Sequence, residues 1–252
     1  MQGFFVQAGN IFGKSIVITD KSDINHIKNV LRYKKGDELI LKSTENRVFE
    51  VVIKSIEQEI INCEIVSSYI SDRVLKTNIT LAQSVIKSQK QDYVIQKATE
   101  LGVRRIIPFI SKNTVVRFDS DKDRAHKIQR WQKIVYESAK QCQRGDIAEV
   151  TEISTLDEVL KLDGFDLKVL CSEKAADVSL KRFLKDNPVP EGASVLVIVG
   201  PEGGWDDSEI EKFLNAGITP LTLGKLIYRA ETAVVAALAQ VIYELEGYGV
   251  VS

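Results

Sequence analysis

The sequence predicts an α/β protein in which a parallel-sheet domain follows a smaller, β-rich domain. Three observations lead to this prediction. Short apolar segments separated by polar turns fill the first 70 positions, strand and helix patterns alternate beyond residue 74, and the apolar run 194–199 leads into a glycine-rich turn. Such a run is typical of a strand buried on both faces of a parallel sheet. We therefore expect one domain at residues 1–70 and a second at 74–252.

The first 70 residues have the pattern of a small barrel. The helix expected here carries an apolar stripe formed by Ile24, Ile27, Val30 and Leu31. Polar turns separate the later strands into a meander. The expected elements are, in chain order, strands at 4–6 and 15–19, a helix at 23–32, and strands at 38–41, 48–53 and 60–66.

Residues 67–72 have the composition of a linker, and the alternation of strand and helix beyond it indicates a parallel sheet. The helix before Gly102 ends where glycine commonly stops helices. The expected strands are at 77–85, 105–110, 150–153, 167–171 and 194–199. Helices are expected at 89–101, at 120–142 and from about 206, and one further helix is expected after each of the strands 150–153 and 167–171. A further strand end near 221–223 precedes the small-residue helix 233–242, whose composition suits tight helix packing or a subunit interface.

Composition excludes several classes of protein. A hydrophobic content of 44% and a charged content of 27% are ordinary for a soluble globular protein. The first residues lack the pattern of a signal peptide and no run reaches transmembrane length, so we expect a cytoplasmic protein without a membrane segment. The three cysteines form no C-x-x-C and there are only two histidines, which argues against a disulfide framework and against a metal site.

The formal net charge of −1 is unevenly distributed along the chain. Residues 73–144 hold 16 Lys and Arg against 6 Asp and Glu, whereas residues 145–252 hold 9 against 19. A basic block of this kind favours contact with a polyanion. The alternative is that the two blocks are solvated helix faces that differ in sign.

Two loops are candidates for a ligand site. The first follows the strand 194–199 and contains Gly200, Glu202 and Gly204, and the second lies within 221–233. Loops at the carboxyl ends of parallel strands are where open α/β sheets bind ligands. Neither a G-x-G-x-x-G nor a P-loop motif is present, and the carboxylate of Glu202 would repel a polyphosphate, so the first loop suits a neutral or cationic ligand. The alternative is that it is only a tight turn.

These residues together resemble one family. Segments 198–204 and 223–233 are similar to the RsmE family of ribosomal RNA uridine-N3 methyltransferases, in the SPOUT superfamily, and segments 96–103 and 131–144 extend the resemblance. It implies a trefoil-knotted, parallel-sheet SPOUT domain that binds S-adenosyl-L-methionine at the knot, works as a homodimer and methylates N3 of a uridine in small-subunit (16S) ribosomal RNA. Residues 26–37 resemble the family's PUA-like RNA-binding domain. The chain departs from the family in having Gln2-Gly3 where an arginine is usual, Ala148 for proline, Lys225 for arginine and Tyr228 for leucine.

The resemblance also implies site residues. The cofactor-binding candidates are Cys171, Ser172, Val199, Gly200, Pro201, Glu202, Gly203, Gly204, Leu223, Gly224, Leu226, Tyr228 and Thr232. The catalytic candidates are Arg229, which would stabilise charge on the uracil carbonyls or a phosphate, and Glu231, which would accept the N3 proton directly or through water. The alternative is that Glu231 serves the helix N-terminus and Arg229 pairs with a carboxylate.

Contacts to RNA are expected from basic and amide side chains in both domains. The candidates are Arg32, Lys34, Lys35, Lys87, Lys90, Arg104, Arg105, Arg117, Gln141 and Arg144. The target uridine would have to be flipped out, because pairing hides its N3 edge. Each candidate taken singly could be a solvated surface charge.

Two other functions stay open: a non-catalytic RNA-binding or ribosome-assembly factor on the same fold, and a nucleotide-cofactor oxidoreductase, which the missing dinucleotide motif disfavours.

Overall fold

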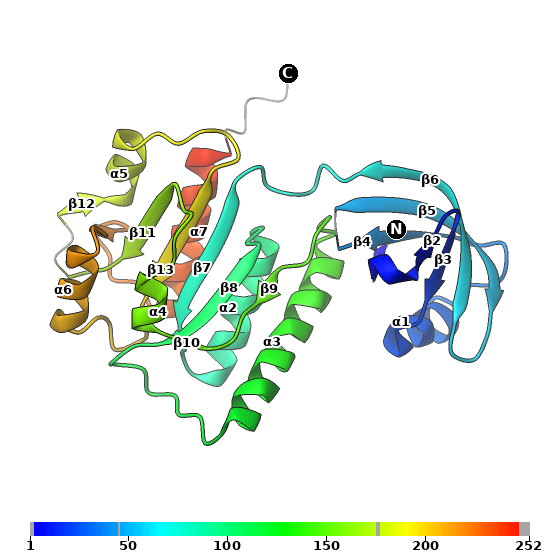
Figure 1. Ribbon diagram of the computed structural model, residues 1–252, viewed down its shortest axis with the longest axis horizontal. Coiled ribbons are helices and arrows are strands. Elements are labelled where there is room, and N and C mark those ends of the chain that lie inside the picture. The colour runs from blue at the N-terminus through cyan, green and yellow to red at the C-terminus, as the bar shows by residue number, and fades with distance from the viewer. Residues whose placement is uncertain (1–2, 45, 175–176, 247–252) are drawn as a thin grey trace. The chain divides into compact units, whose positions relative to one another are not determined.

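The computed structural model describes residues 3–44, 46–174 and 177–246, and the chain forms two compact units (Figure 1). The first unit combines Met1–Val74 with Glu137–Ile147, and the second combines Leu75–Tyr136 with Ala148–Ser252. No helix within the described ranges is both long and apolar enough to cross a membrane.

The first unit is built on a six-stranded half-barrel sheet. Its strands, in spatial order, are β1 (Gly3–Val6), β4 (Glu38–Ser43), β5 (Arg47–Ile56), β6 (Ile61–Ile70), β3 (Ser15–Ile18) and β2 (Ile11–Phe12). β1 and β4 are parallel and the other neighbours are antiparallel, as the expected meander requires. Alternate residues such as Leu39, Leu41, Val51 and Ile53 point into one apolar core, which is the pattern of a sheet that packs one face on a core and exposes the other to solvent.

The helix expected at 23–32 is present in two short pieces, α1 (Lys21–Asn25) and the helical turn η2 (His26–Val30), after the single turn η1 (Ala8–Asn10). α1 begins at Asp20, whose side chain accepts a hydrogen bond from the backbone N–H of Asp23. Ile24 and Ile27 are buried in the core of the unit, as the apolar stripe predicts, whereas Val30 is exposed. The helical segment ends at Arg32, which has a φ of 58°.

Residues 137–147 belong to the first unit through several buried polar contacts. Lys140 Nζ lies 2.7 Å from Asp23 Oδ1, and both side chains are almost fully buried. Lys42 Nζ donates hydrogen bonds to the carbonyls of Gln143 and Arg144. No pattern in the sequence indicates this grouping, and the division at 1–70 and 74–252 stays a prediction about domains.

The second unit contains a sheet of eight strands in which every recorded pairing is parallel. The strands, in spatial order, are β10 (Ser154–Thr155), β8 (Arg105–Ile110), β7 (Asn78–Ser84), β13 (Ser194–Val199), β11 (Leu167–Cys171), β14 (Pro220–Thr222) and β12 (Val178–Ser179), and β9 (Glu149–Val150) pairs with β8. The strand expected at 150–153 is wrong in extent, because the chain pairs only briefly at β9 and again at β10. The parallel sheet itself is confirmed.

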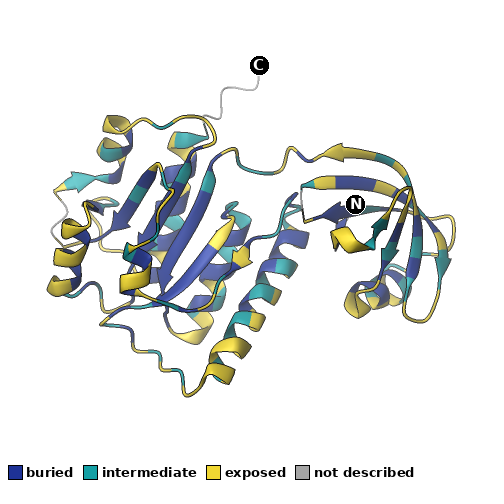
Figure 2. Ribbon diagram, viewed as in Figure 1, coloured by how far each residue is buried: buried dark blue, intermediate teal, exposed yellow. Residues whose placement is uncertain are grey.

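The helices that alternate with these strands are α2 (Ser88–Glu100), α3 (Asp121–Gln141), α4 (Leu156–Leu160), α5 (Leu180–Asp186), α6 (Asp207–Asn215) and α7 (Ala230–Leu245). Figure 2 shows the strands of the sheet largely in the buried colour and the outer turns of the helices exposed. β13 lies between β7 and β11, and residues 195–199 are at most 3% exposed. This burial confirms the prediction that the apolar run 194–199 is a strand buried on both faces.

Candidate functional site

A cavity of about 390 Å³ opens where three strands of the second sheet end. β11 pairs with both β13 and β14, so the carboxyl ends of these strands lie side by side. The cavity is lined by residues at three strand ends and by two helices. These are residues 171–173 at the end of β11, residues 199–202, 204 and 205 at the end of β13, residues 222–229 from the end of β14 onward, Ala230 and Ala233 of α7, and Lys90 of α2. Pockets that bury small ligands have volumes of roughly 300–1,000 Å³, so this one is large enough for a cofactor.

Most of the predicted cofactor-binding residues are brought together at this cavity. Those that line it are Cys171, Ser172, Val199, Gly200, Pro201, Glu202, Gly204, Leu223, Gly224, Leu226 and Tyr228. Two do not line it: Gly203 faces Asn113, and Thr232 is exposed in the first turn of α7. Of the catalytic candidates, Arg229 lines the cavity and Glu231 does not.

The loop after β13 is held by the buried side chain of Trp205, which is 1% exposed. The indole stacks on Phe109 at 6.2 Å and meets Phe213 edge-on at 5.0 Å. Its Nε1–H donates a 2.8 Å hydrogen bond to the carbonyl of Cys171, which ties the end of β11 to this loop. A Cβ at Gly200 would lie 3.0 Å from the indole, so any other residue here would require the ring to shift by a few tenths of an ångström.

Cys171 therefore has a structural role that the sequence does not reveal. Its carbonyl is occupied by Trp205, and burial raises the pKa of its thiol to about 12. The thiol is neutral at physiological pH. Any contribution from Cys171 to a ligand comes from packing rather than from a thiolate.

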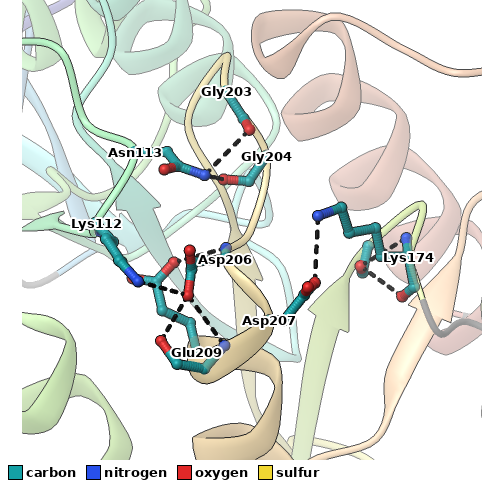
Figure 3. A network of polar contacts seen from close by, with 10 residues as sticks. Lys112, Asn113, Lys174, Gly203, Gly204, Asp206, Asp207 and Glu209 are labelled. Carbon is teal, nitrogen blue, oxygen red and sulfur yellow. Dashed lines mark hydrogen bonds and ion pairs between the residues drawn. The ribbon is translucent and has the colours of Figure 1, made fainter.

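The loop then enters α6 through a strong N-cap (Figure 3). The side chain of Asp206 accepts hydrogen bonds from Ser208, and the carboxylate of Glu209 accepts one from the backbone N–H of Asp206. Lys112 Nζ lies 2.8 Å from Asp206 Oδ1 and also donates to it. These hydrogen bonds, Lys112 first, lower the pKa of Asp206 to about 2. The helix expected from about 206 is thus confirmed, and Asp206 and Glu209 cap its start.

The loop between β14 and α7 forms the opposite wall. Thr222 Oγ1 donates a 2.8 Å hydrogen bond to the carbonyl of Gly224 and accepts one from its N–H. Beyond this turn Leu226 and Ile227 are 72% and 82% exposed. The backbone N–H of Ser172 donates to the carbonyl of Leu221, which joins this wall to the end of β11. The predicted second loop therefore lies beside the first.

Lys90 connects the two loops electrostatically. Its Nζ lies 3.5 Å from Glu202 Oε1 in the first loop and 3.5 Å from Glu231 Oε2 at the start of α7. The backbone N–H of Lys87 also donates to Glu202 at 3.4 Å. Glu231 Oε2 is buried and accepts no hydrogen bond from any residue in the described ranges. The sequence indicates Lys90 only as a candidate for contact with RNA, because its neighbours here come from distant parts of the chain. Unlike most of those candidates it is half-buried.

Arg229 is exposed at the cavity and caps α7 with its backbone, whose carbonyl accepts the N–H of Ala233. Within the part of the chain that the structure describes, no carboxylate forms an ion pair with its guanidinium, so the alternative that it pairs with a carboxylate finds no support. Its positive charge is directed to solvent or to a ligand. Across the same described ranges no cluster of metal-binding side chains is found.

The RNA-binding candidates differ in accessibility. Those that are exposed in the first unit are Arg32, Lys34, Lys35 and Gln141, and those that are exposed in the second unit are Lys87, Arg104, Arg105 and Arg117. Arg104 donates to the carbonyl of Leu75, and Arg105 lies 3.5 Å from Glu149. These two are partly committed to the fold but stay on the surface.

Arg144 is the one buried residue among these candidates. It is 5% exposed, and its guanidinium donates two 2.9 Å hydrogen bonds to the carboxylate of Asp146. This bidentate pair occupies two of the N–H donors that a phosphate could use. A contact between Arg144 and RNA stays a prediction.

Comparison with known proteins places the chain. Residues 73–242 match the sequence profile of the RNA methyltransferase domain, and residues 18–66 match the RNA methyltransferase PUA domain. The ribosomal RNA small subunit methyltransferase E of Bacillus subtilis is 31% identical over 228 residues, covering 89% of this chain and 88% of the relative. The enzyme of the same name from Mesomycoplasma hyopneumoniae is 32% identical, covering 96% of this chain and 99% of the relative.

A solved structure of a protein with the same name is similar to this chain in both sequence and fold. The ribosomal RNA small subunit methyltransferase E of Neisseria gonorrhoeae, bound to S-adenosyl methionine, superposes with a TM-score of 0.85 at 29% identity and covers 99% of this chain and 100% of its own. The predicted fold, a small PUA-like β unit followed by a SPOUT-type parallel-sheet unit, is confirmed, and the expected small barrel is a half-barrel. Since the domain match spans more than half of the chain and the relatives nearly all of it, the chain belongs to the ribosomal RNA small subunit methyltransferase E family.

Proposed function

We propose that this protein is an S-adenosyl-L-methionine-dependent methyltransferase that acts on N3 of a uridine in small-subunit (16S) ribosomal RNA. The observation that carries the proposal is the cavity at the ends of β13, β11 and β14, because its loops are the segments that resemble the family. The relatives are small-subunit ribosomal RNA methyltransferases by name, and one of them binds S-adenosyl methionine.

The residues at the cavity fit this cofactor. Gly200 and Gly204 leave main-chain groups accessible, and backbone groups at strand ends can hydrogen-bond an adenine edge and ribose hydroxyls. Glu202 supplies negative charge that suits a cationic ligand. When bound, the cofactor supplies a methyl group that moves to N3 as its bond to sulfur breaks and the nitrogen–carbon bond forms.

Removal of the N3 proton and stabilisation of charge on the uracil carbonyls fall to residues of this chain. Arg229 lines the cavity and forms no ion pair with a described residue, so its guanidinium suits the developing negative charge on a carbonyl or a phosphate. Glu231 is the proposed proton acceptor, directly or through water. Lys90 Nζ lies 3.5 Å from Glu231 Oε2, an oxygen that accepts no hydrogen bond from any described residue.

The family resemblance supports the remaining parts of the proposal. The exposed candidates on both units would contact the RNA backbone, and the target uridine would enter the cavity flipped out of the helix. The trefoil knot and the homodimer are proposed on the same ground, with the small-residue helix α7 suited to close packing. We expect the protein to act in the cytoplasm on ribosomal RNA or on the small subunit.

Mass spectrometry of nucleosides from small-subunit ribosomal RNA tests this function. RNA from a strain lacking the chain should lose 3-methyluridine at one position, and the wild-type gene should restore it. Loss of the gene without loss of 3-methyluridine would contradict the proposal. RNA binding by the purified chain without measurable affinity for S-adenosylmethionine would favour the assembly-factor alternative.

A further inference from the structure

We infer that Asn113 is a positioning residue that fixes the loop after β13 in its ligand-binding shape. The inference rests on the proposed function, because it concerns the same cavity. The side-chain Nδ2 of Asn113 donates hydrogen bonds to two consecutive carbonyls of that loop, 3.3 Å to Gly203 and 3.1 Å to Gly204 (Figure 3). Asn113 itself does not line the cavity.

Asn113 packs closely against Gly203, so this contact restricts the conformation of the loop after β13. A Cβ added at Gly203 would lie 3.0 Å from Asn113 Cβ and 3.4 Å from its carbonyl oxygen. Gly204 has a φ of 65°, in the left-handed region that glycine adopts without strain. Asn113 thus fixes the carbonyls of the turn from one side while Gly204 presents its other side to the cavity.

The segment 111–114 that carries Asn113 is itself anchored. The hydroxyl oxygens of Ser84 and Ser111 lie 2.7 Å apart, those of Ser84 and Thr114 2.9 Å apart, and all three side chains are buried. The N–H of Ser111 also donates to Thr114 Oγ1. A fully satisfied buried network of this kind rigidifies its segment. The support under the loop is therefore stiff.

Lys112 extends the same support to the start of α6. Its backbone N–H donates a 2.8 Å hydrogen bond to Glu209 Oε1, and its Nζ donates to Asp206 Oδ1. The segment after β8 thus holds the loop at two points. Asn113 binds the carbonyls of Gly203 and Gly204, and Lys112 binds the carboxylates that cap α6. A loop held in its bound shape binds with less loss of conformational entropy, so removing the support should weaken binding without removing any ligand contact.

Calorimetric titration of S-adenosylmethionine and of the product S-adenosylhomocysteine into Asn113→Ala and Asn113→Asp tests the inference. Loss of two carbonyl hydrogen bonds should lower the population of the competent loop and raise the Kd by about 10-fold. Asn113→Asp keeps the size of the side chain but replaces its donor with a carboxylate that repels both carbonyls, so its Kd should rise at least as much. Methyl-transfer kinetics should show a raised KM for S-adenosylmethionine with kcat changed less than about twofold.

Asn187→Ala is the matched control, because the Asn187 amide also donates to a backbone carbonyl, that of Phe183, outside the cavity. It should leave the Kd unchanged. Binding by both Asn113 variants with the wild-type Kd would overturn the inference, as would a fall in binding stoichiometry with unchanged Kd, which indicates misfolded protein. Failure of the wild-type chain to bind either compound would overturn the proposed function, and this inference with it.

Discussion

Replacing Lys140 with methionine would remove the cation that lies 2.7 Å from the carboxylate of Asp23 in the interior of the first unit. The Lys140 side chain is 4% exposed and that of Asp23 is 0% exposed, so water cannot take over the role of the ammonium group. The ammonium group also lies 5.2 Å from the centre of the Phe4 ring. Breaking one partner of a buried ion pair costs about 3–5 kcal/mol, and we expect Lys140→Met to lower the free energy of unfolding by that amount.

Urea unfolding followed by circular dichroism measures this change. The control is Lys54→Met, which breaks the ion pair of Lys54 with Glu64 on the surface of the same unit, where both side chains are about half exposed. An exposed pair contributes less than about 1 kcal/mol, so the control should be nearly as stable as the wild type. The double variant Lys140→Met with Asp23→Leu should recover most of the loss, because neither charge is then left buried alone.

Equal stability of Lys140→Met and Lys54→Met would refute this reasoning. It would mean that Asp23 is stabilised without Lys140. It would also remove the main energetic reason for assigning residues 137–147 to the first unit.

Four further predictions concern the second unit. Gly204→Val forces a β-branched side chain into a φ of 65°, so calorimetry should show loss of S-adenosylmethionine binding by a chain that stays folded, and wild-type affinity would contradict this. Arg229→Ala should slow methyl transfer about 100- to 1,000-fold with little change in cofactor Kd, and an unchanged rate would remove its assigned role. Burial raises the pKa of Cys171 to about 12, so iodoacetamide at pH 8 should leave this thiol unmodified in a mass spectrum of the native protein, whereas rapid alkylation would show that it is accessible. The pKa of Asp206 in the folded protein is lowered from 3.8 to about 2, so the stabilisation from its ionised carboxylate is full above pH 4 and is lost as the pH falls through 2. NMR titration of Lys112→Met should show the pKa of Asp206 moved back toward its ordinary value, and an unchanged pKa would contradict this.

The sheet and the two cavity loops could be predicted because their signals are local. An unbroken apolar run such as 194–199 has few structures open to it other than a buried strand, and the glycines after it mark the turn. The parallel order of strands then brings the next loop alongside. The resemblance at 198–204 and 223–233 lies in the same segments, so pattern and kinship indicated one site.

The contributions that the sequence could not reveal depend on tertiary contacts. Lys90 and Asn113 reach the cavity loops from α2 and from the segment after β8, and nothing in their immediate neighbours distinguishes them from surface residues. Arg144 has the sequence context of a surface arginine, and only its burial shows that it pairs with Asp146. The one local clue was the carboxylate two residues further along the chain.

A crystal structure of the chain grown with S-adenosylmethionine tests the central claim most directly. The account predicts density for the cofactor in the cavity between the loop after β13 and the loop after β14, in contact with main-chain groups near Gly200 and Leu223. An empty cavity at saturating cofactor, or cofactor bound elsewhere on the chain, would contradict it.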